Sequence, residues 1–204
     1  MPSKKEMLAA AWSRSGLARA SLRFRPAPEN SLLVLAYHRI LDLGDEDRFI
    51  GDPELVSAST ADFEWQMRFV ARHFRPTTFG RVLDLEAAGL PLPPRSLIVT
   101  FDDGHADNYV NAFPILRATG VPATIFLSTD YIESESPFWF DLVARIFSVA
   151  PAGAFQLDAV PLAGTLSDVR SRRAATGQLL ARLKRVSNAQ RLACLAELQS
   201  RLQA

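Results

Sequence analysis

The sequence has few of the residues from which metal and redox sites are usually built. It contains one cysteine, Cys194, which excludes an internal disulfide and a zinc site made of several cysteines. Its histidines are His38, His73 and His105, far too few and too scattered for a histidine-rich metal site. The chain can therefore offer few nitrogen or sulfur ligands to a transition metal.

Long apolar runs and a strong net charge are also missing. A helix that spans a bilayer needs about 20 mostly apolar residues, and the run at 32–37 is far shorter. The apolar run Met7–Trp12 ends at Ser13, before it reaches the length of a secretory core. With a formal net charge of +1, no global field favours nucleic acid. We expect a cytoplasmic protein with no transmembrane segment and no nucleic-acid partner.

Charge is nevertheless unevenly distributed along the chain. Residues 1–28 and the segment after 169 are basic, whereas residues 41–64 are acidic. A basic face could meet an anionic lipid or polymer, but such runs are more often solvated helix faces, and we favour that interpretation. Phosphoryl transfer is a weak hypothesis, because the sequence has no Gly-rich phosphate loop followed by Lys and Ser or Thr.

Hydrophobic patterning predicts an α/β half followed by a helical tail. Continuous apolar runs predict strands buried on both faces over 31–37, 96–101 and 121–127. Periodic patterns and caps predict helices over 7–22, 59–74, 79–88, 107–119, 138–149, 168–186 and 188–202, with loops at 41–58 and 150–166. The strand, helix and strand of 96–127 form a βαβ unit, so we expect a parallel sheet.

The predicted helices also indicate where several side chains lie. Phe63, Met67 and Val70 form one apolar stripe of the helix at 59–74, with His73 beside it as a boundary residue. Pro114 either kinks the helix at 107–119 or lies in its first turn.

The last helix has its own signals. Ser187 and Gln190 make a capping box for the helix at 188–202. Its apolar face should consist of Leu192, Leu195, Leu198 and Leu202, with Cys194 as a small buried hydrophobe.

The motif Thr100-Phe101-Asp102-Asp103-Gly104 at the end of a predicted strand carries the clearest chemical signal. Side chains of neighbouring strand residues point to opposite faces, so two adjacent aspartates serve one site only where the chain turns. Gly104 permits such a turn, and active sites of parallel α/β folds lie at the carboxyl ends of strands. Two adjacent carboxylates repel unless a cation compensates, so a divalent metal is the natural partner.

A plain turn is the competing interpretation, because Asp-Asp-Gly is ordinary turn composition. The preceding apolar strand and the βαβ context favour the functional interpretation.

The stretch 94–127, PRSLIVTFDDGHADNYVNAFPILRATGVPATIFL, resembles the NodB-like polysaccharide deacetylases. The segments LVLAYHRI at 33–40 and PFWFD at 137–141 are similar to other parts of that family, so the resemblance covers roughly 30–150. It implies a partial NodB-type distorted (β/α) barrel, followed here by a helical C-terminal segment. It also implies metal-assisted removal of acetyl groups from an N-acetylated sugar polymer or precursor.

The resemblance assigns roles to individual residues. Asp102 matches the family's catalytic base and Asp103 its metal ligand, the metal usually being zinc. His38 and His105 could lie at the rim of the site as ligands or substrate contacts, although a structural role is favoured for each. Trp139 could form the wall of a sugar cleft or simply pack.

Important parts of the family pattern are missing. The sequence has no His-x-x-x-His pair to supply two further zinc ligands, no later arginine-containing motif and no histidine general acid. A catalytic zinc needs about three protein ligands, so zinc is expected only if the missing histidines are supplied. We therefore expect a truncated or split enzyme, or one that a second chain completes.

The predicted organisation has three parts. Residues 1–29 form an N-terminal helical extension, 30–150 a partial deacetylase domain, and 151–204 a helical insertion or tail. The alternative function is a catalytically inactive remnant that binds carbohydrate or protein. Because three strands cannot close a barrel, we also expect an open sheet edge and self-association.

Overall fold

The structure is a computed structural model that describes residues 30–44, 49, 51–134 and 136–202. The predicted helix at 7–22 and the extension at 1–29 lie outside the described residues, as does part of the acidic stretch. Two compact units are present. Described residues 30–36, 66–100 and 116–124 belong to the first, and those of 37–65, 101–115 and 125–204 to the second.

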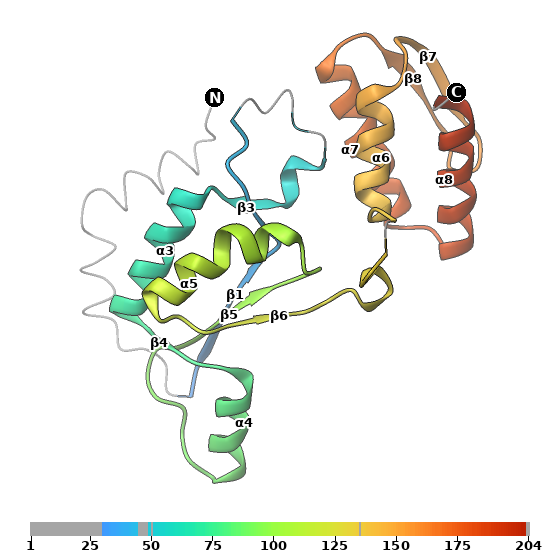
Figure 1. Ribbon diagram of the computed structural model, residues 1–204. Helices are drawn as coiled ribbons and strands as arrows, with labels where there is room; N and C mark the ends of the chain where they lie inside the picture. Colours follow the sequence, from blue (N-terminus) through green and yellow to red (C-terminus); the bar gives the residue numbers. More distant parts are fainter. Residues whose placement is uncertain (1–29, 45–48, 50, 135, 203–204) are drawn as a thin grey trace. The chain divides into compact units, whose positions relative to one another are not determined.

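The central strand of the main sheet is β5 (Ser96–Phe101), and all six of its residues are buried. It pairs with β1 (Leu32–Tyr37), with β4 (Arg75–Pro76), and with β6 (Ala123–Ile125), as Figure 1 shows. Strands β4 and β5 run parallel, in a register that sets Arg75 opposite Ser96. The α/β class and the strand at 96–101 are therefore confirmed.

Two other predicted strands are less buried than their apolar sequences indicate. Leu33 and Val34 of β1 are 46% and 44% exposed, and β6 is only three residues long. Phe126 and Leu127, which follow β6, are exposed as well. A continuous apolar run indicates a strand but not whether a second layer covers it. The prediction of burial on both faces was wrong for these two strands.

The helices beside the sheet follow their sequence signals. Helix α3 (Thr60–His73) begins after Ser59, whose Oγ accepts a hydrogen bond from the Asp62 amide. Helix α4 (Phe79–Ala87) is capped by the Thr78 side chain, and Gly89 lies in the left-handed region just beyond its end. The buried stripe of Phe63, Met67 and Val70 is confirmed.

The helix predicted over 107–119 consists of two segments. A π-helical turn, η3 (Asn108–Ala112), precedes the α-helix α5 (Phe113–Thr119). Pro114 lies in the first turn of α5. Because proline has no N–H to donate to the preceding turn, it interrupts the α-helical ladder where η3 ends.

The stretch predicted as loop at 41–58 contains short regular segments. The 3₁₀ turn η2 (Pro53–Leu55) leads into β3 (Val56–Ala58), which pairs in parallel with β2 (Arg39–Ile40). Strands of two or three residues are too short to produce a periodic pattern, so the sequence alone did not reveal them. A further 3₁₀ turn, η4 (Thr129–Tyr131), follows β6.

Residues 139–202 form a region with its own hydrophobic core. Helix α6 (Trp139–Val149) leads to β7 (Gly153–Leu157) and β8 (Leu162–Leu166), an antiparallel hairpin, followed by α7 (Val169–Leu183) and α8 (Asn188–Leu202) (Figure 1). The prediction of a loop at 150–166 was wrong. Glycines and prolines obscured an alternation in which Phe155, Leu157 and Leu162 point into the core.

The last helix confirms most of its prediction. The Ser187 amide donates to Gln190 Oε1, while the Gln190 amide donates to Ser187 Oγ, so the capping box is present. Cys194 is fully buried, whereas Leu192 is 57% exposed. At 3.6 residues per turn, Leu192 lies about 140° around the helix from the face centred on Cys194 and Leu198, and its assignment to the apolar face was wrong.

Candidate active site

A tight turn follows β5 and places both aspartates of the motif at one end of the strand. Asp103 and Gly104 have φ values of 71° and 70°, in the left-handed region. A Cβ on Gly104 would lie 2.5 Å from Leu127 Cδ2, so the Leu127 side chain would have to move to admit it. Asp103 accepts a conformation that costs a non-glycine residue energy, which is typical of functional turns.

Asp102 and His38 are brought together because β1 and β5 end side by side. The Asp102 amide donates to the Tyr37 carbonyl at 2.9 Å, which places the residue after each strand at the same edge of the sheet. The His38 amide donates to Ser57 Oγ at 2.9 Å, and His38 Nε2 lies 3.9 Å from Asp102 Oδ2. The Asp102 side chain is 41% exposed, so its carboxylate is open to solvent.

Asp103 is held from two sides. Its Oδ1 accepts a hydrogen bond of 3.1 Å from Ser128 Oγ. Its Oδ2 lies 4.0 Å from His105 Nε2. The carboxylate is therefore oriented by one oxygen while the other faces an imidazole nitrogen.

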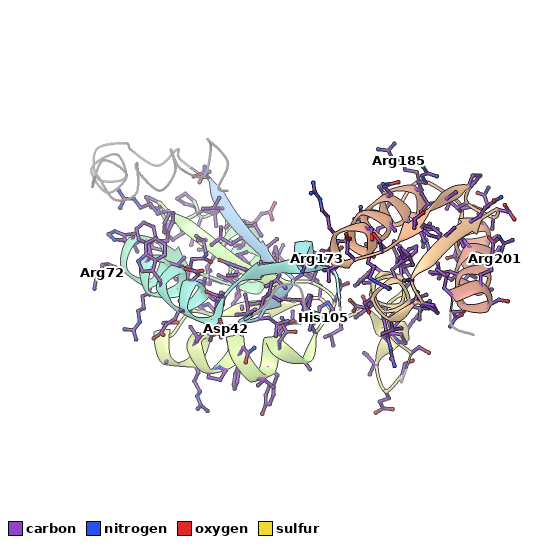
Figure 2. The ribbon with its side chains drawn as sticks, turned by 90° about the horizontal axis from the view of Figure 1, so that it is seen from above. Asp42, Arg72, His105, Arg173, Arg185 and Arg201 are labelled. Carbon is purple, nitrogen blue, oxygen red and sulfur yellow. The ribbon has the colours of Figure 1, made fainter. Side chains whose placement is uncertain are left out.

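The side chain of His105 is more buried than those of His38, Asp102 and Asp103. Its side chain, labelled in Figure 2, is 7% exposed, and its ring centroid lies 5.1 Å from that of Phe138. Nε2 is buried and has no hydrogen-bond partner. Burial lowers the pKa of His105, as does the charge of Arg39, against the opposing effect of Asp107, Asp141 and Asp103.

Two residues after the motif matter to the geometry and were missed by the sequence reasoning. The buried Asp107 accepts hydrogen bonds from Arg39 Nε at 3.0 Å and from the Ile40 amide at 2.9 Å. Asn108 Nδ2 donates to the His38 carbonyl at 2.8 Å. Together they fix the chain after β1, and with it the position of His38. Their only sequence signal was their place directly after the Asp-Asp-Gly turn.

Asp141 was missed as an individual residue, although the PFWFD segment was noted. Its Oδ1 is buried without a hydrogen-bond partner. Burial raises the pKa of Asp141, while Arg39 and His105 act in the opposite direction. A buried carboxyl oxygen without a hydrogen-bond partner is uncommon in native structures.

Trp139 is partly buried and packs within the C-terminal region. It packs against the hydrophobic cluster of residues 143–198, and the Arg191 guanidinium lies 5.0 Å from its ring centroid. A role as the wall of a sugar cleft stays a prediction.

The donor set does not complete a zinc site. Among the residues that the structure describes, no group of three or more His, Cys, Asp or Glu side chains could hold a metal ion. Asp103 and His105 are two suitable donors facing each other, but a catalytic zinc needs about three. The predicted dependence of zinc on further ligands stays a prediction. Within the described part of the chain, no helix is long and apolar enough to cross a membrane.

Comparisons with known proteins point to one family. Residues 89–155 match the family model described as polysaccharide deacetylase. The chain is 29% identical over 99 residues to the poly-beta-1,6-N-acetyl-D-glucosamine N-deacetylase of Escherichia coli (strain K12), a match that covers 48% of this chain and 14% of that protein. It is 32% identical over 124 residues to the protein of the same name from Staphylococcus aureus (strain MSSA476), with 57% and 42% covered. The chain therefore spans less than half the length of either relative.

Two solved structures that are similar to this chain have related names. A de-N-acetylase from Aggregatibacter actinomycetemcomitans aligns with a TM-score of 0.44 and 22% identity, covering 52% of this chain and 42% of that one. IcaB from Ammonifex degensii aligns with a TM-score of 0.42 and 25% identity, covering 58% and 49%.

Proposed function

We propose that this chain, whose residues 89–155 belong to the polysaccharide deacetylase family, carries the base-bearing half of a site that removes acetyl groups from an acetylated polysaccharide. The observation that carries the proposal is the turn after β5, which presents an exposed Asp102 beside an oriented Asp103. Family members are generally metal-dependent, and Asp103 is the residue that the resemblance assigns to the metal.

Asp102 is the residue that would accept a proton. Amide hydrolysis requires water to lose a proton as it attacks the carbonyl carbon, and an exposed carboxylate at the site edge can take that proton. His38, with Nε2 3.9 Å from Asp102 Oδ2, would hold the carboxylate in place through its charge when protonated. Asp107 and Asn108 would keep the His38 backbone at this edge.

The substrate class comes from the relatives. Both are named as N-deacetylases of poly-beta-1,6-N-acetyl-D-glucosamine, so we propose an N-acetylated hexosamine polymer or its precursor for this chain. The cleaved bond is then an amide, and the products are acetate and a free amine.

A second candidate is a binding module without catalysis. It is favoured by the lack of a three-donor metal group among the described side chains. Such a module would bind the same polymer at the β5 edge without releasing acetate.

One experiment separates the two candidates. The protein, purified as its source makes it and supplied with zinc, is incubated with N-acetylated β-1,6-linked glucosamine oligomers, and acetate release and oligomer binding are measured in parallel. Release of acetate supports the deacetylase. Binding without release supports the module, and neither binding nor release contradicts both.

Self-association through the sheet edge is part of the proposal. Strand β1 has β5 as its neighbour in the sheet order, and its Leu33 and Val34 are exposed. Such an edge can pair with another chain. We expect light scattering to give a mass above 22.5 kDa, and a sharp monomeric peak would contradict this.

A further inference from the structure

A cavity of about 670 Å³ lies beside helix α7, and the proposed deacetylation uses none of the residues that line it. Helix α6 contributes Ala144 and Ser148 to its wall, and residues 49 and 51–53 line it as well. All of these residues belong to the second compact unit. Sites for small molecules usually have volumes of about 300–1,000 Å³, so the cavity is large enough to hold one.

The lining of the cavity has an excess of positive charge. Among the described residues that line it, Asp52 is the one carboxylate, whereas four are cationic: Arg172, Arg173, Lys184 and Arg185. Figure 2 labels Arg173 and Arg185. A concave surface with charge of one sign attracts ligands of the opposite sign, so the cavity suits an anion.

Two of these cations, Lys184 and Arg185, follow directly after the last residue of α7 and are exposed. Neither side chain makes a hydrogen bond or an ion pair with any residue in the described part of the chain. The C-terminal end of a helix carries only about half a negative charge, so the dipole of α7 does not balance two adjacent cations. Both groups are therefore available to an anionic ligand.

The acidic residues nearest in sequence are engaged elsewhere. Residues 150–202 contain three of them, Asp158, Asp168 and Glu197. Asp158 and Glu197 both pair with Arg201, and Asp168 caps the start of α7. The protein's own carboxylates in this region thus leave the cations at the end of α7 unneutralised.

Gly177 opens room in the middle of α7. A Cβ at this position would meet nothing within 4 Å. Glycine inside a helix is less stable than alanine, and no neighbouring atom in the described structure requires it here. Gly177, Ala181 and Lys184 all line the cavity and share one face of the helix, with Lys184 about 10.5 Å along the axis from Gly177. The open floor and the cations therefore form one continuous site.

The scaffold of the cavity is held in place by packing. Leu180 lines the cavity and also belongs to the buried cluster that contains Phe147 of α6. Arg172 Nη1 donates to the Phe147 and Ala150 carbonyls, both at 2.7 Å, and so ties α7 to the end of α6. Because Arg172 has this structural role, Lys184 and Arg185 are the residues left to bind a ligand.

We propose that this cavity binds a small soluble molecule that carries a phosphate group, with the phosphate at Lys184 and Arg185 and the rest of the molecule over Gly177. At pH 7 a phosphate monoester carries a charge of about −1.5 to −2 and three acceptor oxygens, which matches two adjacent cations better than a carboxylate does. The site is separate from the proposed deacetylation and does not depend on it.

Calorimetric titration with glucose 6-phosphate, inorganic phosphate and glucose tests the charge recognition. We expect both phosphates to bind and glucose not to bind. Lys184→Gln and Arg185→Gln should each weaken phosphate binding by at least about tenfold, because each removes a charge-assisted hydrogen bond. Arg182→Gln is the matched control: Arg182 is exposed on the same helix, is not among the residues that line the cavity, and should leave binding nearly unchanged.

A change at Gly177 tests the cavity without altering its charge. Gly177→Leu should fill the room and weaken the binding of glucose 6-phosphate more than that of inorganic phosphate, whereas Gly177→Ala should bind both nearly as the wild type does. Circular dichroism and thermal melts show whether each variant folds.

Four results would overturn the proposal. They are binding of neither phosphate by the wild type, binding of glucose as tight as that of glucose 6-phosphate, an equal loss in Arg182→Gln, and unchanged binding of glucose 6-phosphate by a folded Gly177→Leu protein. Binding to phosphatidylglycerol vesicles but to neither soluble phosphate would also contradict it, because the ligand would then be a lipid surface. Acetate release is measured separately, since these variants alter no residue of the candidate active site.

Discussion

The turn after β5 and the C-terminal region of residues 139–202 differ in backbone strain and in how their polar groups are paired. The C-terminal region buries a contiguous apolar cluster, and the Glu197 carboxylate there accepts hydrogen bonds from the Asp158 and Ala159 amides. Asp141 Oδ1, in α6, is the exception among these described residues, because it is buried without a partner. The turn after β5 instead holds a non-glycine residue with positive φ and, in η3 and His105, buried polar atoms without partners.

This difference distinguishes a region that stabilises the fold from a region that carries the candidate site. Strain and unpaired polar atoms reduce stability, so they persist where the surrounding structure enforces them, most often at functional sites. The β5 strand, fully buried along its length, provides such support for the turn. Among the described residues of 139–202, no non-glycine residue has a positive φ, and we infer that this region contributes mainly folding energy.

The comparison predicts that the largest loss of stability follows from a change in the C-terminal core. Phe147 is fully buried and makes an edge contact with Phe155, with ring centroids 5.2 Å apart. Phe147→Ala should lower the free energy of unfolding by about 3–5 kcal/mol, because it leaves a cavity. Chemical denaturation measures this.

The exposed Leu192 provides the control for that change. Leu192→Ala should stay within about 0.5 kcal/mol of wild type, because the side chain is mostly in solvent. Equal losses for the two variants would contradict the assignment of the core.

A smaller loss is expected at the turn. Gly104→Ala should destabilise by about 1–3 kcal/mol, because alanine would be strained at φ 70° and would clash with Leu127. Gly120→Ala is the matched control: Gly120 has φ 69°, but a Cβ there would meet nothing within 4 Å.

Chemical denaturation of both glycine variants distinguishes the cost of the positive φ from the cost of the steric clash. The excess loss in Gly104→Ala reports the contact with Leu127. If the two losses are equal, the close approach at the turn is unimportant.

The smallest stability effect concerns pH. Because the pKa of Asp141 is raised, the folded state binds its proton more tightly than the unfolded state, and stability falls as pH rises above the normal value near 3.8. Asp141→Asn removes this penalty. We expect it to stabilise the protein at pH 7, with the gain fading as the pH falls toward 4.

Asp168 should give the opposite pH dependence of stability. Hydrogen bonds from Ser171 lower its pKa, so its ionised form adds stability at neutral pH that is lost on acidification. Asp168→Asn should therefore lose stability at pH 7 and approach wild type at low pH. Parallel trends in the two variants would show that burial does not govern Asp141.

Much of the fold could be predicted because its signals are local. The buried run at 96–101 and the capping box of Ser187 and Gln190 depend on nearby residues, and the structure reproduces them. The β7–β8 hairpin and the exposure of Leu33 could not be predicted in this way. Both depend on which distant side chains cover a face, and a single sequence does not encode that in a simple period.

In the candidate site, too, the local features could be predicted and the contacts between distant residues could not. The pairing of Asp102 with Asp103 in a turn followed from strand geometry and Gly104. The contacts of His38 with Asp102 and of Asp107 with Ile40 join residues far apart in the sequence. They depend on the register between strands, which the composition of either segment does not reveal.

The most direct test of the central claim is the activity of Asp102→Asn on N-acetylated β-1,6-linked glucosamine oligomers. Asparagine keeps the size of the side chain but cannot accept the proton from water. We predict that kcat falls by about 10²–10⁴-fold while the unfolding free energy and zinc affinity stay close to wild type. Acetate release at the wild-type rate by a folded Asp102→Asn protein would contradict the account.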